Sequence, residues 1–269
     1  MSIKPVTFCI ALLFVFFSCT KSDKFPVKKS EKAASDNVFL NQSIFPVTAS
    51  VLYDSVQKID FGKELNELLG YKQFYENRNE QFELVKLENL WNNLKVETKN
   101  FNFESVSGWI EITGFLLEIT GKELYASELE NIVNQSSNLF TMTELNQIEK
   151  LLVPWIFTKY VDHIHVNLFV NATIKYNHTL KGKVEITQET NFPESGKIQL
   201  KFKMENKRYI ELFIRIPDWA EGATVTEKGV KYVAHPGEYC QITRKWSDGN
   251  LVEINFPIEK VPEYLRTAN

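Results

Sequence analysis

Two pairs of titratable side chains have spacings that could support chemistry. His163 and His165 are two residues apart, which on a strand places both imidazoles on one face, where they can bind a metal. No third ligand is near them in the sequence, so a solvated strand face is the favoured interpretation.

Glu104 and Glu111 are two helical turns apart, so their carboxylates would lie roughly 10 Å apart along the helix axis. That separation is slightly long for a general acid and base that act on one bond, and a solvated helix surface is the favoured explanation of Glu111.

Neither the cysteines nor the common catalytic sequence motifs indicate a particular chemistry. The three cysteines, Cys9, Cys19 and Cys240, cannot form a disulfide framework or a four-thiolate zinc site. The sequence contains no GxGxxG, Walker A, HExxH or GxSxG motif, so nucleotide binding and standard hydrolase chemistry are not indicated.

The elements that position these residues begin with helices. Apolar residues recur at spacings of three and four and predict a helical domain over residues 46–160. An apolar cluster at Leu65–Leu69 precedes a predicted break at Gly70. Gly121 is expected to end one helix and Pro154 to interrupt another. Four helices are predicted after Gly70, over residues 82–94, 105–120, 123–134 and 143–157.

The hydrophobic period then changes to two and predicts a β-sandwich domain over residues 161–269. In the run 164–176 every even position is apolar or small, and the runs 198–204, 210–216 and 252–258 repeat the pattern. Short alternating runs of this kind, separated by Gly and Pro turn signals, are typical of antiparallel sheets. The predicted fold class is therefore α+β, a helical domain followed by an antiparallel β-sandwich.

Composition excludes several classes of protein. The chain of 269 residues is 43% hydrophobic and 24% charged, with a net charge of −3, which is ordinary for a globular protein. Because there is no basic surplus, nucleic acid is not an expected partner. The 20 phenylalanines and 10 tyrosines are typical of β-rich folds with thick cores.

The first residues are predicted to be a targeting segment. Residues 1–18 carry Lys4 before the apolar run Val6–Phe17, which is too short to span a bilayer and fits a secretory signal peptide. The run ends in a lipobox-like Phe-Phe-Ser-Cys, so we expect lipidation at Cys19, followed by a flexible tether over residues 19–45. The alternative is an ordinary signal peptide with a chance cysteine. The expected location is the bacterial cell envelope, lipid-anchored on the periplasmic or outer-membrane face.

Two stretches of the β-domain resemble a known enzyme family. Val184–Pro193 and Ile210–Ala220 are similar to the "TQxTxYP" and "LRIPxWA" patterns of the β-L-arabinofuranosidases of glycoside hydrolase family 127. Further stretches match other patterns of that family in the same order: Leu117–Ala126 and Glu128–Glu130 ("LLTGDxKYADxLE"), His165–Phe169 ("YVNLY"), and Pro236–Tyr239 with Arg244–Trp246 and Val252–Pro257 ("GxY…R.W..GD.V.L..P"). The resemblance implies that the helical domain is a shortened remnant of an α/α helical barrel.

The same resemblance implies that the catalytic centre is incomplete. In the family a glutamate and three cysteines hold zinc, and one cysteine is the nucleophile. Glu104 matches the glutamate and is the one catalytic candidate, but Val106 stands where a cysteine is expected, and the paired cysteines would fall near Phe140–Thr141. A thiolate is both the soft metal ligand and the nucleophile. We therefore expect no metal and no cofactor.

Four tryptophans are candidates for sugar binding or for the core. Trp109 and Trp155 lie in the helical domain that carries the family's site, so they are candidate pocket walls, although core packing is the favoured alternative. Trp219 and Trp246 lie in β-domain motifs, and packing is favoured for both.

Two functional hypotheses follow. The first is a catalytically degenerate cell-envelope lipoprotein, a pseudoenzyme with a carbohydrate-related binding or structural role. The second is an active or truncated glycosidase that hydrolyses arabinose-containing glycans, with Glu104 or other carboxylates in place of thiolates. The expected partners are carbohydrate and, through the lipid anchor, the membrane. Fold similarity alone does not decide between the hypotheses.

Overall fold

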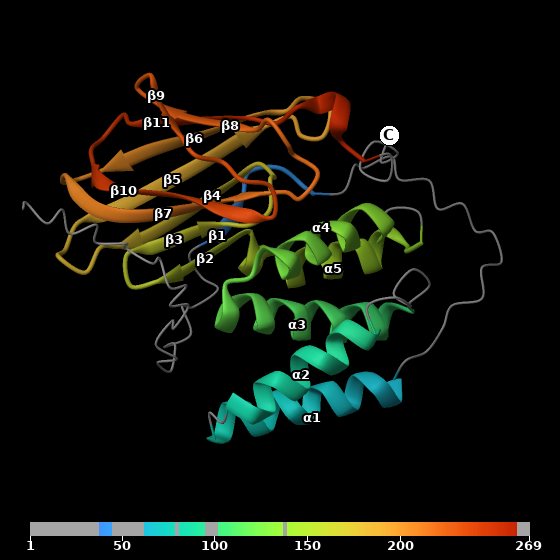
Figure 1. Ribbon diagram of the computed structural model, residues 1–269. Helices are drawn as coiled ribbons and strands as arrows, with labels where there is room; N and C mark the ends of the chain where they lie inside the picture. Colours follow the sequence, from blue (N-terminus) through green and yellow to red (C-terminus); the bar gives the residue numbers. More distant parts are fainter. Residues whose placement is uncertain (1–37, 45–61, 79–80, 95–101, 137–138, 263–269) are drawn as a thin grey trace, which may run out of the picture.

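The computed structural model describes residues 38–44, 62–78, 81–94, 102–136 and 139–262. Figure 1 shows these residues as a stack of helices beneath two β-sheets, with α1 and α2 furthest from the sheets and α3 between them and α4 and α5. The α+β fold class predicted from the sequence is confirmed. The helices of the described residues are α1 (Gly62–Arg78), α2 (Gln81–Leu94), α3 (Phe103–Thr120), α4 (Glu123–Ser136) and α5 (Met142–Ile156).

Helix α3 is the centre of the helical layer, in contact with α1, α4 and α5. Its N-cap is Asn102, whose side-chain oxygen accepts a hydrogen bond from the Ser105 N–H, the usual way to satisfy a free donor at a helix start. The helix ends at Gly121, which has a positive φ of 63° and donates its N–H to the Leu117 carbonyl. The predicted stop at Gly121 is confirmed.

The predicted break at Gly70 is wrong, because α1 continues through this residue to Arg78. A glycine inside a helix costs about 1 kcal/mol relative to alanine. Leu65 and Leu68, which precede Gly70 in α1, are buried in the core, and burial of each leucine contributes about 1.5–3 kcal/mol. Packing therefore outweighs the local cost of the glycine.

The β-domain is a sandwich of two sheets. One has seven antiparallel strands in the order β1-β4-β5-β6-β11-β8-β9, and the other has four strands in the order β10-β7-β3-β2. The Trp246 ring of one sheet stacks on the Phe202 ring of the other, with centroids 4.2 Å apart, so Trp246 is a core residue as expected. The strands are β1 (Val38–Leu40), β2 (Phe157–Tyr160), β3 (His163–Val166), β4 (Ala172–Asn177), β5 (Lys183–Thr190), β6 (Lys197–Met204), β7 (Arg208–Ile216), β8 (Thr224–Glu227), β9 (Val230–Tyr232), β10 (Glu238–Trp246) and β11 (Leu251–Asn255).

The alternating run 164–176 is two strands rather than one, because the chain crosses from one sheet to the other between β3 and β4. The crossing is held by the Gln188 side-chain amide, which donates to the carbonyls of Leu168 and Val170. This crossover also makes β3 parallel to β7, so the expectation of a purely antiparallel sandwich is wrong for that pair. Parallel neighbours need a long connection, and strands β4 to β6 provide it.

Three boundaries differ from those predicted. Strand β1 pairs with β4, so residues 38–40, which the predicted tether over residues 19–45 included, belong to the sheet, and the rest of that prediction before Val38 lies outside the described residues. The change from helix to strand falls at Ile156–Phe157 rather than at residue 160. Ile258 lies in a short 3-10 helix and is 37% exposed, so the last strand ends earlier than the alternating pattern indicated.

Two helical glycines give a matched test of the packing. A Cβ at Gly114 of α3 would lie 2.1 Å from the Trp155 ring, whereas a Cβ at Gly70 of α1 would meet no atom within 4 Å. We expect Gly114→Ala to lower the free energy of unfolding by about 1–3 kcal/mol through overpacking. Gly70→Ala should raise it by about 0.5–1 kcal/mol. Urea denaturation followed by circular dichroism measures both, and a Gly114→Ala protein as stable as the Gly70→Ala protein would contradict this packing.

Candidate functional site

Glu104, the catalytic candidate that the resemblance implies, lies on the surface. It is in the first turn of α3 with an exposed side chain, where a carboxylate interacts favourably with the helix dipole. Glu111, further along α3, accepts a hydrogen bond from Lys72 of α1 at 2.7 Å and is 52% exposed. Glu111 is therefore a solvated helix charge, as favoured from the sequence.

The two segments expected to carry thiolates do meet in the structure, but their side chains are not ligands. The Phe103 ring, at the start of α3, contacts the Phe140 ring edge-on with centroids 6.4 Å apart. Val106 is 6% exposed and Phe140 is 1% exposed. The Thr141 hydroxyl is the N-cap of α5, where it accepts from the Glu144 N–H and donates to the Glu144 carboxylate.

This set of donors does not fit the zinc of the family. Structural and catalytic zinc sites need three or four nitrogen, sulfur or carboxylate ligands. One exposed carboxylate at Glu104 and one hydroxyl already engaged in a cap fall short of that number. Across the described part of the chain, no group of three or more His, Cys, Asp or Glu side chains is placed to hold a metal ion.

The structure corrects the assignment of Trp109 as a candidate pocket wall. Its ring is completely buried, stacks on Trp91 with centroids 5.2 Å apart, and donates its indole N–H to Glu128 at 3.0 Å. A ligand cannot reach this ring without repacking of the core, so the favoured alternative of core packing holds. Trp155 is half-buried and its ring lies against Gly114.

The two strand histidines differ in environment although they share a face. The His165 ring stacks on Phe213 with centroids 4.5 Å apart, and burial, with a smaller contribution from His163, lowers the pKa of His165 to about 4. His163 is 40% exposed and lies 3.7 Å from the Glu211 carboxylate. The interpretation of a solvated strand face is therefore right for His163 and wrong for His165.

A buried charge cluster that the sequence reasoning missed joins the helices to the four-stranded sheet. Arg215 of β7 is completely buried and donates to Glu123 at 3.1 Å and to Glu130 at 2.6 Å, both on α4. Its Nε donates to the Asn167 carbonyl at 2.6 Å. The Tyr239 hydroxyl donates to the Asn167 side chain at 2.7 Å. We call these five residues the Arg215 junction.

The family-like motifs are the sequence signal that could have revealed this junction. Arg215, Asn167 and Tyr239 lie in three separate family-like stretches of the β-domain, and Glu130 lies in the helical stretch. Burial raises the pKa of Glu130, while the Arg215 guanidinium acts in the opposite direction. Because these side chains satisfy one another inside the protein, the shared motifs mark a structural contact between two layers.

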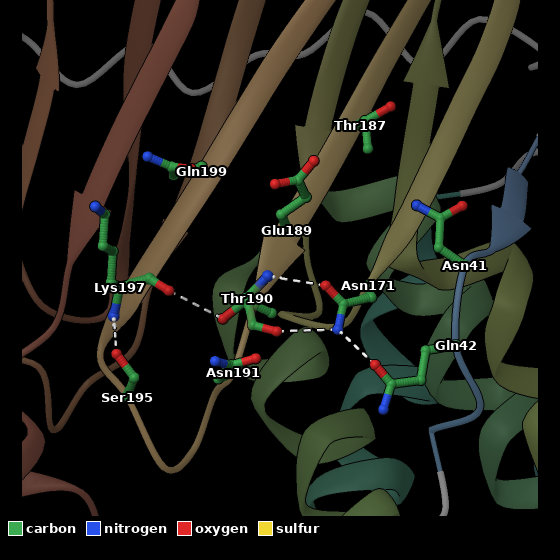
Figure 2. A pocket seen from close by; sticks show the side chains of 10 residues that line it. All are labelled: Asn41, Gln42, Asn171, Thr187, Glu189, Thr190, Asn191, Ser195, Lys197 and Gln199. Atoms are coloured by element: carbon green, nitrogen blue, oxygen red, sulfur yellow. Dashed lines mark hydrogen bonds between the residues drawn. The ribbon is translucent and has the colours of Figure 1, made fainter.

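A polar groove of about 560 Å³ lies on the outer face of the seven-stranded sheet. Figure 2 shows its side chains on β5, β6 and the segments beside β1 and β4. Each lining residue is polar, and they include Asn41, Gln42, Asn171, Thr187 and Gln199. We call this feature the outer-face groove. Its volume is within the usual range of ligand sites, roughly 300–1,000 Å³.

The floor of the groove is held by an ordered amide network. Asn171 donates to the Gln42 side chain at 3.1 Å and to the Thr190 carbonyl at 2.9 Å, and its side-chain oxygen accepts from the Thr190 N–H. Asn41 exchanges hydrogen bonds with the Thr173 hydroxyl. The polar surface is therefore held in place before any ligand arrives. None of the candidate residues named from the sequence lines this groove.

Comparison with known proteins confirms the resemblance for the β-domain. Residues 163–258 match the family model described as beta-L-arabinofuranosidase, GH127 middle domain. The fold is similar to the crystal structure of a GH127 β-L-arabinofuranosidase from Geobacillus stearothermophilus T6, with a TM-score of 0.58 and 18% identity over 72% of this chain and 41% of that chain. A second GH127 β-arabinofuranosidase has a TM-score of 0.48 and 19% identity over 57% of this chain and 32% of that chain. The chain thus spans less than half the length of these enzymes. No curated protein matches the sequence.

Removal of the buried guanidinium gives a pH-dependent test of the junction. We expect Arg215→Met to lower the free energy of unfolding by about 3–5 kcal/mol near neutral pH, because it leaves buried carboxylates unpaired. The pKa of Glu130 is already raised by burial, so the Glu130 carboxyl group binds its proton more tightly in the folded chain than in the unfolded chain. Stability from this group is therefore present at low pH and lost as pH rises through the folded pKa. Loss of Arg215 raises that pKa further, so urea denaturation should show a larger loss at pH 8 than at pH 5.

Arg208 is a matched control on the same strand, because its guanidinium donates to the carbonyls of Leu180 and Lys181 at the surface. Arg208→Met should cost about 1 kcal/mol or less, with no such dependence on pH. An Arg215→Met loss that is equal at both pH values would contradict the assigned charge pairing.

Proposed function

We propose that this chain is a cell-envelope lipoprotein related to the GH127 enzymes that does not hydrolyse glycosides by their thiolate and zinc chemistry. Its role is carbohydrate-related, in binding or in the structure of the envelope. The proposal is supported by the match of residues 163–258 to the GH127 middle domain and by the chemistry of the residues at the expected catalytic positions.

The observation that carries the proposal is the pair of buried apolar side chains where thiolates are expected. Val106 and Phe140 are both within the core, and neither side chain can bind zinc or attack an anomeric carbon. Cys240 does not replace them, because it lies buried on β10 in the other domain, where burial raises the pKa of its thiol to about 11. A thiol with a raised pKa is a poor nucleophile at neutral pH.

The proposal predicts no arabinofuranosidase turnover and no bound zinc. We expect purified protein to carry far less than one zinc per chain by elemental analysis. Hydrolysis of an aryl β-L-arabinofuranoside should be slower by several orders of magnitude than in an enzyme that has its nucleophile, as with about 10⁶-fold losses in nucleophile deletions of subtilisin. Stoichiometric zinc with turnover that Glu104→Gln abolishes would contradict the proposal. Turnover without zinc, also abolished by Glu104→Gln, would support the alternative of an active glycosidase that uses carboxylates.

The lipoprotein part of the proposal rests on the sequence before the described residues, since Cys19 and the signal segment 1–18 lie outside them. Within the described ranges, no helix is long and apolar enough to cross a membrane. A lipid on Cys19 would supply the anchor.

The anchor has a direct test in the two N-terminal cysteines. We expect Cys19→Ala to move the protein from the membrane fraction to the soluble fraction, because it removes the acceptor of the lipid. Cys9→Ala is the matched control, because Cys9 lies within the apolar run of the signal segment, and it should leave the distribution unchanged. Unchanged membrane association of Cys19→Ala, measured by ultracentrifugation and immunoblot, would refute lipidation.

A further inference from the structure

We propose that the outer-face groove binds an uncharged oligosaccharide that lies along β5 and β6 and is held through its hydroxyl groups. This inference rests on the carbohydrate-related role proposed above and assigns that role to a surface away from Glu104. It is carried by the charge balance of the groove, its free hydrogen-bonding groups and the aromatic ring beside it.

The charges in the groove are already balanced by neighbours on the sheet. Glu189 pairs with Lys201 at 2.5 Å, and Lys197 lies 3.9 Å from Glu253. No surplus of one sign is left to attract an ion, so an anionic or cationic ligand gains little at this site. An uncharged, polar ligand is the chemistry that fits.

The groove keeps hydrogen-bonding groups that are not engaged within the described residues. The Asn191 side chain is exposed and makes no hydrogen bond there, while the Gln42 oxygen accepts from Asn171 and leaves its NH₂ open. The Gln199 NH₂ donates to Glu253 at 3.3 Å, which leaves its oxygen open. Amide side chains offer two donors and an acceptor in one plane, and vicinal hydroxyls of a sugar can pair with both.

The form of the groove also favours a sugar chain over a peptide. Each lining residue is polar, so the groove offers no apolar pocket for peptide side chains. Its floor is fixed by the Asn171 and Asn41 networks described above, which lowers the entropy cost of ordering the site upon binding. A groove of about 560 Å³ has room for several sugar rings.

An exposed aromatic ring lies on the same face. Phe39 of β1 is 48% exposed and pairs in register with Thr173 of β4. The Thr173 hydroxyl contacts the groove residues Asn41 and Thr187, so Phe39 lies on the same outer face. The Lys175 ammonium lies 5.9 Å from the Phe39 ring centroid. An aromatic ring at this position can contact the apolar C–H face of a sugar ring while the amide side chains of the groove form hydrogen bonds with the sugar hydroxyls.

The test uses the full chain, purified in detergent, and ligand-observed NMR with defined probes. The neutral probes are arabino-oligosaccharides and xylo-oligosaccharides of four to six units, and the charged probe is oligogalacturonate of the same length. The test variant is Asn191→Ala with Gln199→Ala, which removes two groups that hold none of the floor. The matched control is Lys203→Ala, on strand β6 and on the same outer face but outside the groove.

We expect at least one neutral series to bind at concentrations up to about 10 mM and oligogalacturonate to bind at least about tenfold more weakly. The double variant should weaken binding of the neutral probe by roughly tenfold, because it loses two hydrogen bonds. Lys203→Ala should bind like the unmodified chain.

Three results would overturn the assignment. Neutral binding that is equally tight in the double variant would place the sugar elsewhere, and would leave the proposed function standing. Oligogalacturonate that binds as tightly as the neutral probes would refute the charge argument. No neutral binding in either series would remove the groove as a sugar site, whereas turnover of the aryl arabinofuranoside would remove only the non-catalytic part of the proposed function.

Discussion

A guanidinium buried between a sheet and a helix must be matched by negative charge, and in this protein that requirement determines how the helical layer sits on the sandwich. Arg215 is completely enclosed, and Glu123 and Glu130 of α4 are its charge partners. Loss of one partner from such a cluster costs about 3–5 kcal/mol, a large part of the total stability of a domain. The register of α4 on β7 is therefore fixed by this contact, and Asn167 extends it to the end of α5 through the Trp155 carbonyl.

This constraint gives the family-like stretches a structural role that does not depend on catalysis. Arg215, Asn167, Tyr239 and Glu130 need one another for hydrogen bonding inside the protein, so a change at one leaves others unsatisfied. At the positions where the resemblance predicts cysteines, Val106 and Phe140 are buried in the core, and the Phe140 ring contacts Phe103.

Structural features that depend on residues close together in the sequence could be predicted from it. Features that depend on contacts between distant residues could not. The end of α3 at Gly121 and the inward faces of β6 and β7 follow from spacing alone. The parallel pairing of β3 with β7 does not, because an alternating run gives the face of a residue but not its sheet. The burial of Trp109 depends on Trp91 and Glu128 from two other helices. The outer-face groove combines the residues that follow β1 with β5 and β6, which lie far from them in the sequence.

The Arg215 junction and the outer-face groove therefore differ in how their polar side chains are used. The junction is buried and charged, and its side chains are engaged with one another, so a ligand could use them only by breaking contacts that stabilise the fold. The groove is polar and open, and its floor is tied to the backbone while residues such as Asn191 and Gln42 keep groups free. Rigid support beneath exposed polar groups is the arrangement that binding sites need. The proposed binding role is thus physically independent of Glu104 and Val106, because the floor of the groove is held by its own amide network on the seven-stranded sheet.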